Sequence, residues 1–353
     1  MAQINKPTDY FETTTYAGGT TAITSLDFSP DWVWAKKRTG AENHGIFDSV
    51  RGATKTINSN TSSAESTRSG ALTSFDSNGW SMGGADGIIS ASGSDYVAWS
   101  WRGSDSSAVS NTDGSITSTI SANTTSGFSI VSYTGNLTSG VTVGHGLSAV
   151  PKMIIIKNRD DASAEWNVYH GSLGATKGLK LNTTDSAFTA TNRWNDTEPT
   201  SSVFTLGNAT DINDNAENYI AYCFAEKKGF SKFGKFTSNG SDDGTFTYCG
   251  FKPAWVMMKA NVTDAWSNWY IFDTKRDVAN ITDSPLYANL STQEAYYGGS
   301  PATNYSQIDM LSNGFKMRRD GNWGLGGSGT EVIYMAFAEQ PLVGTNDIPA
   351  TAR

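Results

Sequence analysis

One phrase occurs three times along this chain: a proline, five mostly apolar residues and then a lysine. The copies are PDWVWAK from Pro30, PKMIIIK from Pro151 and PAWVMMK from Pro253. A second apolar pair follows each copy at a nearly constant distance, as Ile46-Phe47, Val168-Tyr169 and Ile271-Phe272. Similar segments at a fixed spacing indicate an internal repeat, in which each copy folds as one unit. The sequence therefore predicts three copies of one unit, each of about 100 residues.

Other recurring phrases set the boundaries of the repeats. GATK occurs twice, SNGWSMG matches SNGFKMR, and the phrases YVAWSW, YIAYCFAE and YMAFAEQ close the copies. A polar Ser/Thr-rich stretch after the first copy is typical of a linker, with one short strand at Ser115 to Ile120. We therefore expect repeats at 1–103, 127–226 and 227–340, a linker at 104–126 and a tail at 341–353.

Composition favours an all-β fold. Only 37% of the residues are hydrophobic, yet 12% are aromatic, so large rings supply much of the buried surface. Apolar runs of about four to eight residues alternate with turn-forming clusters, and no segment keeps a helical period. This pattern predicts three tandem β-sandwiches of the jelly-roll or lectin-like kind. The alternative is a single prism-like body, since repeated units can also close around an axis.

Charge and cysteine content exclude several classes of protein. The chain carries 26 Lys+Arg against 34 Asp+Glu, so it lacks the excess of bases that a general nucleic-acid binder needs. No run reaches the roughly 18 apolar residues of a membrane span, and the first residues lack the pattern of a signal peptide. We therefore expect neither nucleic-acid binding nor membrane insertion. Cys223 and Cys249 lie in apolar runs and are expected to be buried free thiols, although pairing stays open.

Alternation along the repeated phrase identifies its core positions. Trp32 and Trp34 share one face of a strand, because side chains alternate with period two. The matching positions of the other two copies carry Met153, Ile155, Trp255 and Met257. Positions that accept Met and Ile as well as Trp are core positions, so these tryptophans are not expected to form a binding platform. The lysine that ends each phrase is expected where the strand emerges into water.

Aromatic and basic residues in polar surroundings are the candidate binding residues. Exposed rings can stack on the faces of sugars, and guanidinium groups can bind acidic ones. Four tryptophans in polar contexts and one arginine fit this description: Trp166, Trp194, Trp266, Trp323 and Arg51. Packing at the rim of a sheet is the alternative role for each of these rings.

The sequence offers no set of residues that predicts catalysis. Hydrolysis of a polysaccharide needs two carboxylates placed across a cleft, and the candidates are Asp48, Asp273, Glu165 and Glu226. Asp48 and Asp273 hold equivalent places in the repeat, which favours a structural role for both. We therefore expect a protein that is not an enzyme.

Two patterns bear on metal binding. The three histidines, His44, His145 and His170, hold unequal places in the repeat, so a shared metal is not expected. Asp211, Asn213 and Asn215 place oxygen side chains at the alternate positions with which calcium loops begin. Ala216 and Tyr222 stand where such loops carry a glycine and a glutamate. We therefore expect no cofactor, with calcium at this loop as the alternative.

Several phrases of the chain resemble those of bacteriophage virion proteins. GFSIVSYTGN, VGHGLSAVPKMIIIKNRD and EWNVYHGS are similar to phrases of tail-fibre-like proteins, particularly those of marine tailed phages. FSPDWVWAKKR, NHGIFDSVRGATK and DMLSNGFKMR are similar to the units found beside them. The resemblance covers nearly the whole chain and implies a structural, non-catalytic component of the virion.

The resemblance also implies a place and a set of partners. A tail fibre or receptor-binding component is the first expectation. A capsid decoration (head fibre) or tail-assembly protein is the alternative, and a polysaccharide depolymerase is the third. The expected partners are other virion proteins, further copies of the chain in a trimer, and host surface polysaccharide. The protein would be made in the host cytoplasm without a signal peptide and would end on the particle surface.

Overall fold

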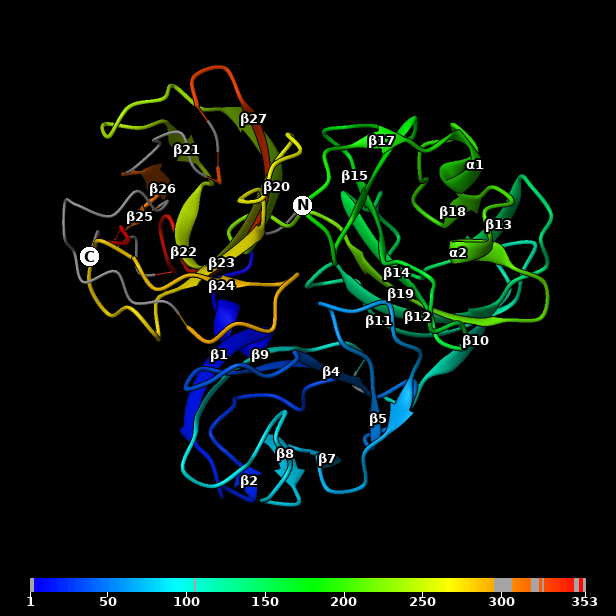
Figure 1. Cartoon of the computed structure of the whole chain (residues 1–353), viewed down its shortest axis with the longest axis horizontal. Helices are drawn as coiled ribbons and strands as arrows, with labels where there is room; N and C mark the ends of the chain where they lie inside the picture. The colour runs from blue at the N-terminus through cyan, green and yellow to red at the C-terminus, as the bar shows by residue number, and fades with distance from the viewer. Residues whose placement is uncertain are drawn as a thin grey trace.

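The computed structural model describes residues 3–104, 106–294, 307–318, 324–325, 327–345 and 349–351. Its fold is all-β, and its strands form three lobes around a common centre (Figure 1). The helices of the described residues are short: η1 (Pro7–Asp9), α1 (Thr191–Trp194) and α2 (Thr210–Asn213). Among these residues, no helix has the length and apolarity needed to cross a membrane.

Lobe 1 contains two main sheets. The larger sheet has the strand order β1-β9-β3-β4, and the smaller one has the order β2-β8-β7. A separate two-stranded ladder pairs β5 with β6. The strands are β1 (Phe11–Ala17), β2 (Ala22–Ile23), β3 (Trp32–Lys37), β4 (Gly45–Asp48), β5 (Lys55–Thr56), β6 (Ser66–Thr67), β7 (Leu72–Asp76), β8 (Gly79–Met82) and β9 (Asp95–Trp101).

Lobe 2 has a larger sheet of order β10-β11-β12-β19-β14-β15-β16-β17 and a smaller one that pairs β13 with β18. The expected linker, for which the sequence predicts one short strand, supplies the two outermost strands β10 and β11 on one side of this sheet. The strands are β10 (Val109–Asn111), β11 (Ser118–Asn123), β12 (Phe128–Thr134), β13 (Val141–Gly144), β14 (Met153–Asn158), β15 (Asn167–His170), β16 (Lys177–Lys180), β17 (Phe188–Thr189), β18 (Val203–Leu206) and β19 (Asn218–Phe224).

Lobe 3 has a larger sheet of order β20-β27-β22-β23-β24 and a smaller one of order β21-β26-β25. In the described part of the chain, neither sheet has an added pair of strands like β10 and β11. The strands are β20 (Ser231–Thr237), β21 (Phe246–Tyr248), β22 (Phe251–Ala260), β23 (Trp269–Asp273), β24 (Leu286–Tyr287), β25 (Ile308–Leu311), β26 (Gly314–Met317) and β27 (Glu331–Pro341).

One strand order is common to the three larger sheets. It is β1-β9-β3-β4 in lobe 1, β12-β19-β14-β15 in lobe 2 and β20-β27-β22-β23 in lobe 3. The repeated proline phrase supplies β3, β14 and β22, which lie at the same place in each sheet. The register agrees as well, since Trp32 pairs with Trp101, Met153 with Phe224 and Trp255 with Phe337.

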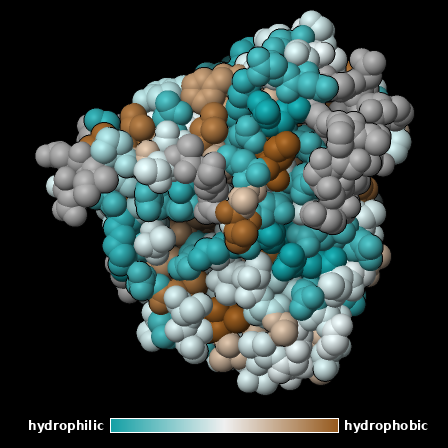
Figure 2. Space-filling model, turned by 90° about the vertical axis from the view of Figure 1, so that its left-hand side faces the viewer, coloured by the Kyte–Doolittle hydropathy of each residue, from teal (hydrophilic) through white to brown (hydrophobic). Residues whose placement is uncertain are grey.

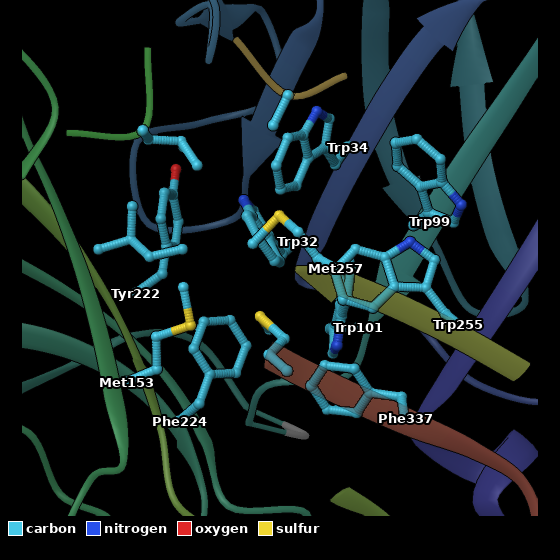
Figure 3. Packing of buried hydrophobic residues seen from close by; sticks show 14 of the residues in the cluster. Trp32, Trp34, Trp99, Trp101, Met153, Tyr222, Phe224, Trp255, Met257 and Phe337 are labelled. Atoms are coloured by element: carbon cyan, nitrogen blue, oxygen red, sulfur yellow. The ribbon is translucent and has the colours of Figure 1, made fainter. Parts of the chain in front are cut away.

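The three larger sheets share a central core of aromatic and sulfur-containing side chains (Figure 3). The six positions identified by alternation all lie in it: Trp32, Trp34, Met153, Ile155, Trp255 and Met257. Ring contacts cross between lobes, because Trp32 lies 4.6 Å from Tyr222 and Trp101 lies 5.7 Å from Trp255, measured between centroids. Each lobe also has a second cluster between its own two sheets. The lobes are therefore joined by one continuous core.

Hydrogen bonds to two buried ion pairs join lobe 1 to both of its neighbours. Asp48 of lobe 1 pairs with Arg51 and accepts a hydrogen bond of 2.8 Å from the Tyr222 hydroxyl of lobe 2. Asp273 of lobe 3 likewise pairs with Arg276 at 2.6 Å and accepts a bond from the Trp99 indole of lobe 1. The register places Trp99 and Tyr222 at equivalent positions, so the two seams are built alike.

The equivalent contact between lobes 2 and 3 is made by neutral groups. His170 stands where the other lobes have Asp48 and Asp273, and its Nε2 atom lies 3.2 Å from the carbonyl oxygen of Tyr334. Nδ1 accepts a bond from the Ser172 amide, so Nε2 carries the proton and donates. Burial lowers the pKa of His170 to about 4, which keeps the ring neutral. Leu173 takes the place that arginine holds in the other two seams.

The lysines of the repeated phrase do not emerge into water. Lys36, Lys157 and Lys259 are fully buried, and each ammonium group donates to backbone carbonyl oxygens. Two of them reach a neighbouring lobe, since Lys36 donates to Ser291 and Lys259 to Thr184. The expectation failed because a lysine at this place continues the inward face of the strand. The adjacent lobe covers Lys36 and Lys259, and Lys157 instead donates to carbonyl oxygens of Asp161 and Ala164 in its own lobe.

Candidate functional site

Two of the expected binding tryptophans lie inside the protein. Trp166 is fully buried, and its indole donates a 2.9 Å hydrogen bond to the carbonyl oxygen of Asn58 in lobe 1. Trp194 ends helix α1 and packs edge-on against Tyr169 at 5.8 Å. Neither ring offers a face to a ligand.

The other two tryptophans differ in what the structure says of them. Trp266 lies in the loop between β22 and β23 and is 43% exposed, so it keeps a surface for binding. Its backbone amide is held by the side chain of Asp264 at 2.7 Å. Trp323 lies outside the described residues.

Arg51 and two of the carboxylate candidates are held in the interior. The side chains of Arg51, Asp48 and Asp273 are all inaccessible to solvent and are paired as described above. Glu226 makes a surface ion pair with Lys232, and Glu165 accepts a hydrogen bond from Asn182. Arg51 is therefore not available to an acidic sugar, and these four carboxylates do not face one another across a cleft as a set.

The expected calcium loop is engaged in other contacts. Asp211 forms an ion pair with Arg193 at 2.6 Å. Asn213 is fully buried, donates to the carbonyl oxygens of Gly207 and Thr138, and accepts from the Asn136 amide. Asn215 lies in the exposed loop that follows. The loop therefore does not gather its oxygens around one point, and the described residues contain no metal-binding cluster of His, Cys, Asp and Glu.

The histidines and cysteines have structural surroundings. His44 accepts a bond from the Trp34 indole at Nδ1, and its Nε2 atom lies 2.9 Å from the carbonyl oxygen of Tyr287 in lobe 3. His145 has the same kind of environment, between the Leu147 amide and the Thr200 carbonyl. Burial lowers the pKa of both rings. Cys223 and Cys249 are buried free thiols, as expected.

The smaller sheet of lobe 3 carries an exposed aromatic pair on its outer face. Phe246 and Tyr248 lie on β21 and are 44% and 56% exposed, while Thr247 between them is buried. Alternation along the strand places both rings on the solvent side. Their positions on the strand are two residues apart, which corresponds to about 7 Å of rise. The buried neighbours Phe315 and Met317 on β26 anchor the sheet to the lobe. We call Phe246 and Tyr248 the aromatic pair.

The surroundings of the aromatic pair leave its rings open. Gly314 lies opposite Tyr248 across the ladder, so no side chain covers the tyrosine from that strand. A Cβ atom at Gly314 would lie 2.0 Å from the carbonyl oxygen of Thr247, so close packing of the strands requires glycine there. Lys316 lies opposite Phe246 and forms an ion pair with Asp243. The rings thus border a charged margin on one side.

The other two lobes do not carry this pair. The register places Ala22 of lobe 1 and Thr142 of lobe 2 where lobe 3 has Phe246, and Gly144 of lobe 2 where it has Tyr248. In lobe 2 the strand is also covered, because the Ile116 amide donates to the carbonyl oxygen of Thr142. Figure 2 shows the lobe 3 side of the molecule, on which hydrophobic residues lie separately among hydrophilic ones. The aromatic pair is therefore particular to lobe 3.

Comparison with known proteins assigns the chain to a family. Residues 6–341 match the family model described as a domain of unknown function, DUF7483. The chain belongs to the DUF7483 family. The match takes in all three lobes. No curated protein and no solved structure matches the chain.

Sequence reasoning missed the aromatic pair of this DUF7483 protein, although one signal pointed to it. The segment GTFTYCGF alternates aromatic and polar residues over a short strand, and alternation alone leaves open which face is buried. The matching strand of lobe 2, VTVG, carries small residues on the outward positions. The aromatic residues that lobe 3 carries at outward positions, where lobe 2 has small residues, were therefore a better indicator of the exposed pair than the polar surroundings of the tryptophans.

Proposed function

We propose that this protein is a non-enzymatic structural component of a bacteriophage virion, a fibre or receptor-binding component that contacts host surface glycan through lobe 3. The observation that carries the proposal is the aromatic pair on the outer face of the smaller sheet of lobe 3. Exposed rings on a sheet add nothing to the core, and aromatic side chains present a flat apolar face to which a sugar ring can stack.

Two further observations support the proposal. The repeated phrases resemble those of phage tail-fibre-like proteins over nearly the whole chain. The acidic candidates Asp48 and Asp273 are engaged in buried ion pairs, which supports a structural rather than a hydrolytic role. The proposal includes contact with other virion proteins and assembly in trimers on the particle surface.

The test measures adsorption of the purified chain to host cells and to their extracted polysaccharide. The variant Phe246→Ala/Tyr248→Ala should lose at least tenfold in affinity. Trp266→Ala is the matched control, because this ring has nearly the same exposure as Phe246 but lies in a separate loop. It should bind as the parent does.

Other results would change the assignment. Equal binding by parent and double variant would remove the aromatic pair from the site, and a loss confined to Trp266→Ala would move the site to that loop. A parent chain that binds neither cells nor polysaccharide, together with antibody labelling of the phage head, would favour the capsid decoration role. Cleavage of the polysaccharide would establish a depolymerase.

A further inference from the structure

A groove of about 610 Å³ lies beside the aromatic pair and has Tyr248 as one of its walls. The groove is also lined by the segment between β19 and β20, by the first residues of β20, and by Gln3, Leu342 and Val343. Tyr248 belongs both to the outer face of the sheet and to the groove. A ligand that stacks on this ring therefore also faces the groove.

The groove is lined by three lysines and one carboxylate: Lys227, Lys228, Lys232 and Glu226. Glu226 is already paired, since its carboxylate lies 2.8 Å from the ammonium group of Lys232. This leaves the positive charges of Lys227 and Lys228 without a carboxylate among the residues that line the groove. The local excess is notable because the whole chain has a formal charge of -8.

Lys227 is held in place but not neutralised. Its ammonium group donates to the carbonyl oxygen of Thr124 in lobe 2, which fixes the side chain at the junction of the two lobes. Burial lowers the pKa of Lys227, and no acidic group opposes that effect. Lys228 is exposed at the rim, and its backbone carbonyl is bonded to the Ile4 amide. A partly desolvated amine without a counter-ion favours an anionic ligand.

We propose that this groove binds the carboxylate of an acidic sugar, so that the glycan contacted by lobe 3 is an anionic polysaccharide. The sugar ring stacks on Tyr248, and its carboxylate lies between the ammonium groups of Lys227 and Lys228. Gln3 lies in the same groove, and its side-chain nitrogen already donates to Asn5 and to the carbonyl oxygen of Val343, which leaves its side-chain oxygen to accept from a hydroxyl group of the sugar. This inference rests on the proposed function and specifies its ligand class.

The experiment compares two probes with the full chain by calorimetry at low and at moderate salt. One is a carboxylated oligosaccharide, an alginate hexamer, and the other is a neutral glucose hexamer. Lys227→Gln/Lys228→Gln should weaken binding of the alginate hexamer at least tenfold and leave any binding of the neutral hexamer unchanged. Lys152→Gln/Lys177→Gln is the matched control, because it removes the same two charges from lobe 2. It should change alginate binding less than twofold.

The possible outcomes separate this inference from the proposed function. Equal binding of the acidic and the neutral hexamer, lost in Tyr248→Ala, would leave the glycan site in place and overturn the acidic specificity. Equal losses in the two double lysine variants would show a non-specific charge effect and would also overturn it. Binding of neither hexamer nor of host polysaccharide would overturn the proposed function itself.

Discussion

The ion pair between Asp48 and Arg51 gives the sharpest test of how the lobes are joined. Both side chains are fully buried, and Arg51 also lies 3.3 Å from Glu65. Arg51→Leu would leave the Asp48 carboxylate in the interior with the Tyr222 hydroxyl and one backbone amide as donors. Removal of one partner from a buried ion pair typically costs about 3–5 kcal/mol, because an uncompensated charge remains. We expect a loss in this range.

The chain itself suggests the compensating substitution. Lobe 2 has His170 and Leu173 at the positions of Asp48 and Arg51, and the contact that His170 makes with lobe 3 is neutral. Asp48→His/Arg51→Leu transfers this arrangement to lobe 1 and removes both charges together. We expect the double variant to be more stable than Arg51→Leu by at least about 1.5 kcal/mol, a coupling within the range found for residues in direct contact.

The assay is urea unfolding followed by tryptophan fluorescence, which reports on the central core because Trp32, Trp34 and Trp101 lie there. Lys6→Ala is the control, since Lys6 forms ion pairs at the surface with a side chain that is 59% exposed. A surface pair of this kind contributes about 0–1 kcal/mol. A loss below about 1 kcal/mol for Arg51→Leu, or a double variant no more stable than the single one, would refute the reasoning.

Two more predictions concern the interior. Burial lowers the pKa of Lys36 and Lys157 to about 8 and that of Lys259 to about 7, against the usual lysine pKa of 10.5. Between about pH 7 and pH 10.5 the unfolded chain therefore binds more protons than the folded chain. The free energy of unfolding should therefore rise with pH over this range, and it should rise less steeply in Lys259→Met. An unchanged slope of the unfolding free energy against pH in this variant would contradict the prediction. Trp255→Ala should cost about 3–5 kcal/mol, because its ring contacts both Trp101 of lobe 1 and Phe337 of lobe 3. Thermal unfolding measures this loss, and a melting temperature equal to that of the parent would show that the ring is not needed there.

The sequence predicted the central core well because period-two alternation acts within a single strand. Trp32 and Trp34 lie on one face of their strand, their counterparts lie on the same face of the equivalent strands, and in all three copies that face is buried. The same rule applied to Lys36 would have placed it inside, since it is two residues beyond Trp34. Local polarity suggested water instead, and only the neighbouring lobe, which covers the lysine, decides the matter.

The candidate site was less predictable because exposure depends on packing between distant segments. Trp166 lies in a polar stretch of sequence, yet its indole is used in the seam with lobe 1. Phe246 and Tyr248 belong to a strand whose pattern resembles that of buried strands elsewhere, yet lobe 3 leaves them open. Sequence polarity could not distinguish these cases, since in each one the deciding contacts are made by residues far along the chain.

The difference between the aspartate contacts and the His170 contact has a consequence for folding. Three similar lobes in one chain run the risk of docking in the wrong arrangement, which is a characteristic failure of repeat proteins. A lobe that carries an aspartate at its edge needs a neighbour that supplies a hydroxyl or an indole, and His170 instead meets a backbone carbonyl. A wrongly docked lobe would leave the buried carboxylate without this hydrogen bond from the neighbouring lobe, at a cost of about 1.5–3 kcal/mol for a bond to a charged group. The seams thus allow each lobe to recognise its own neighbour, although all three are built on one pattern.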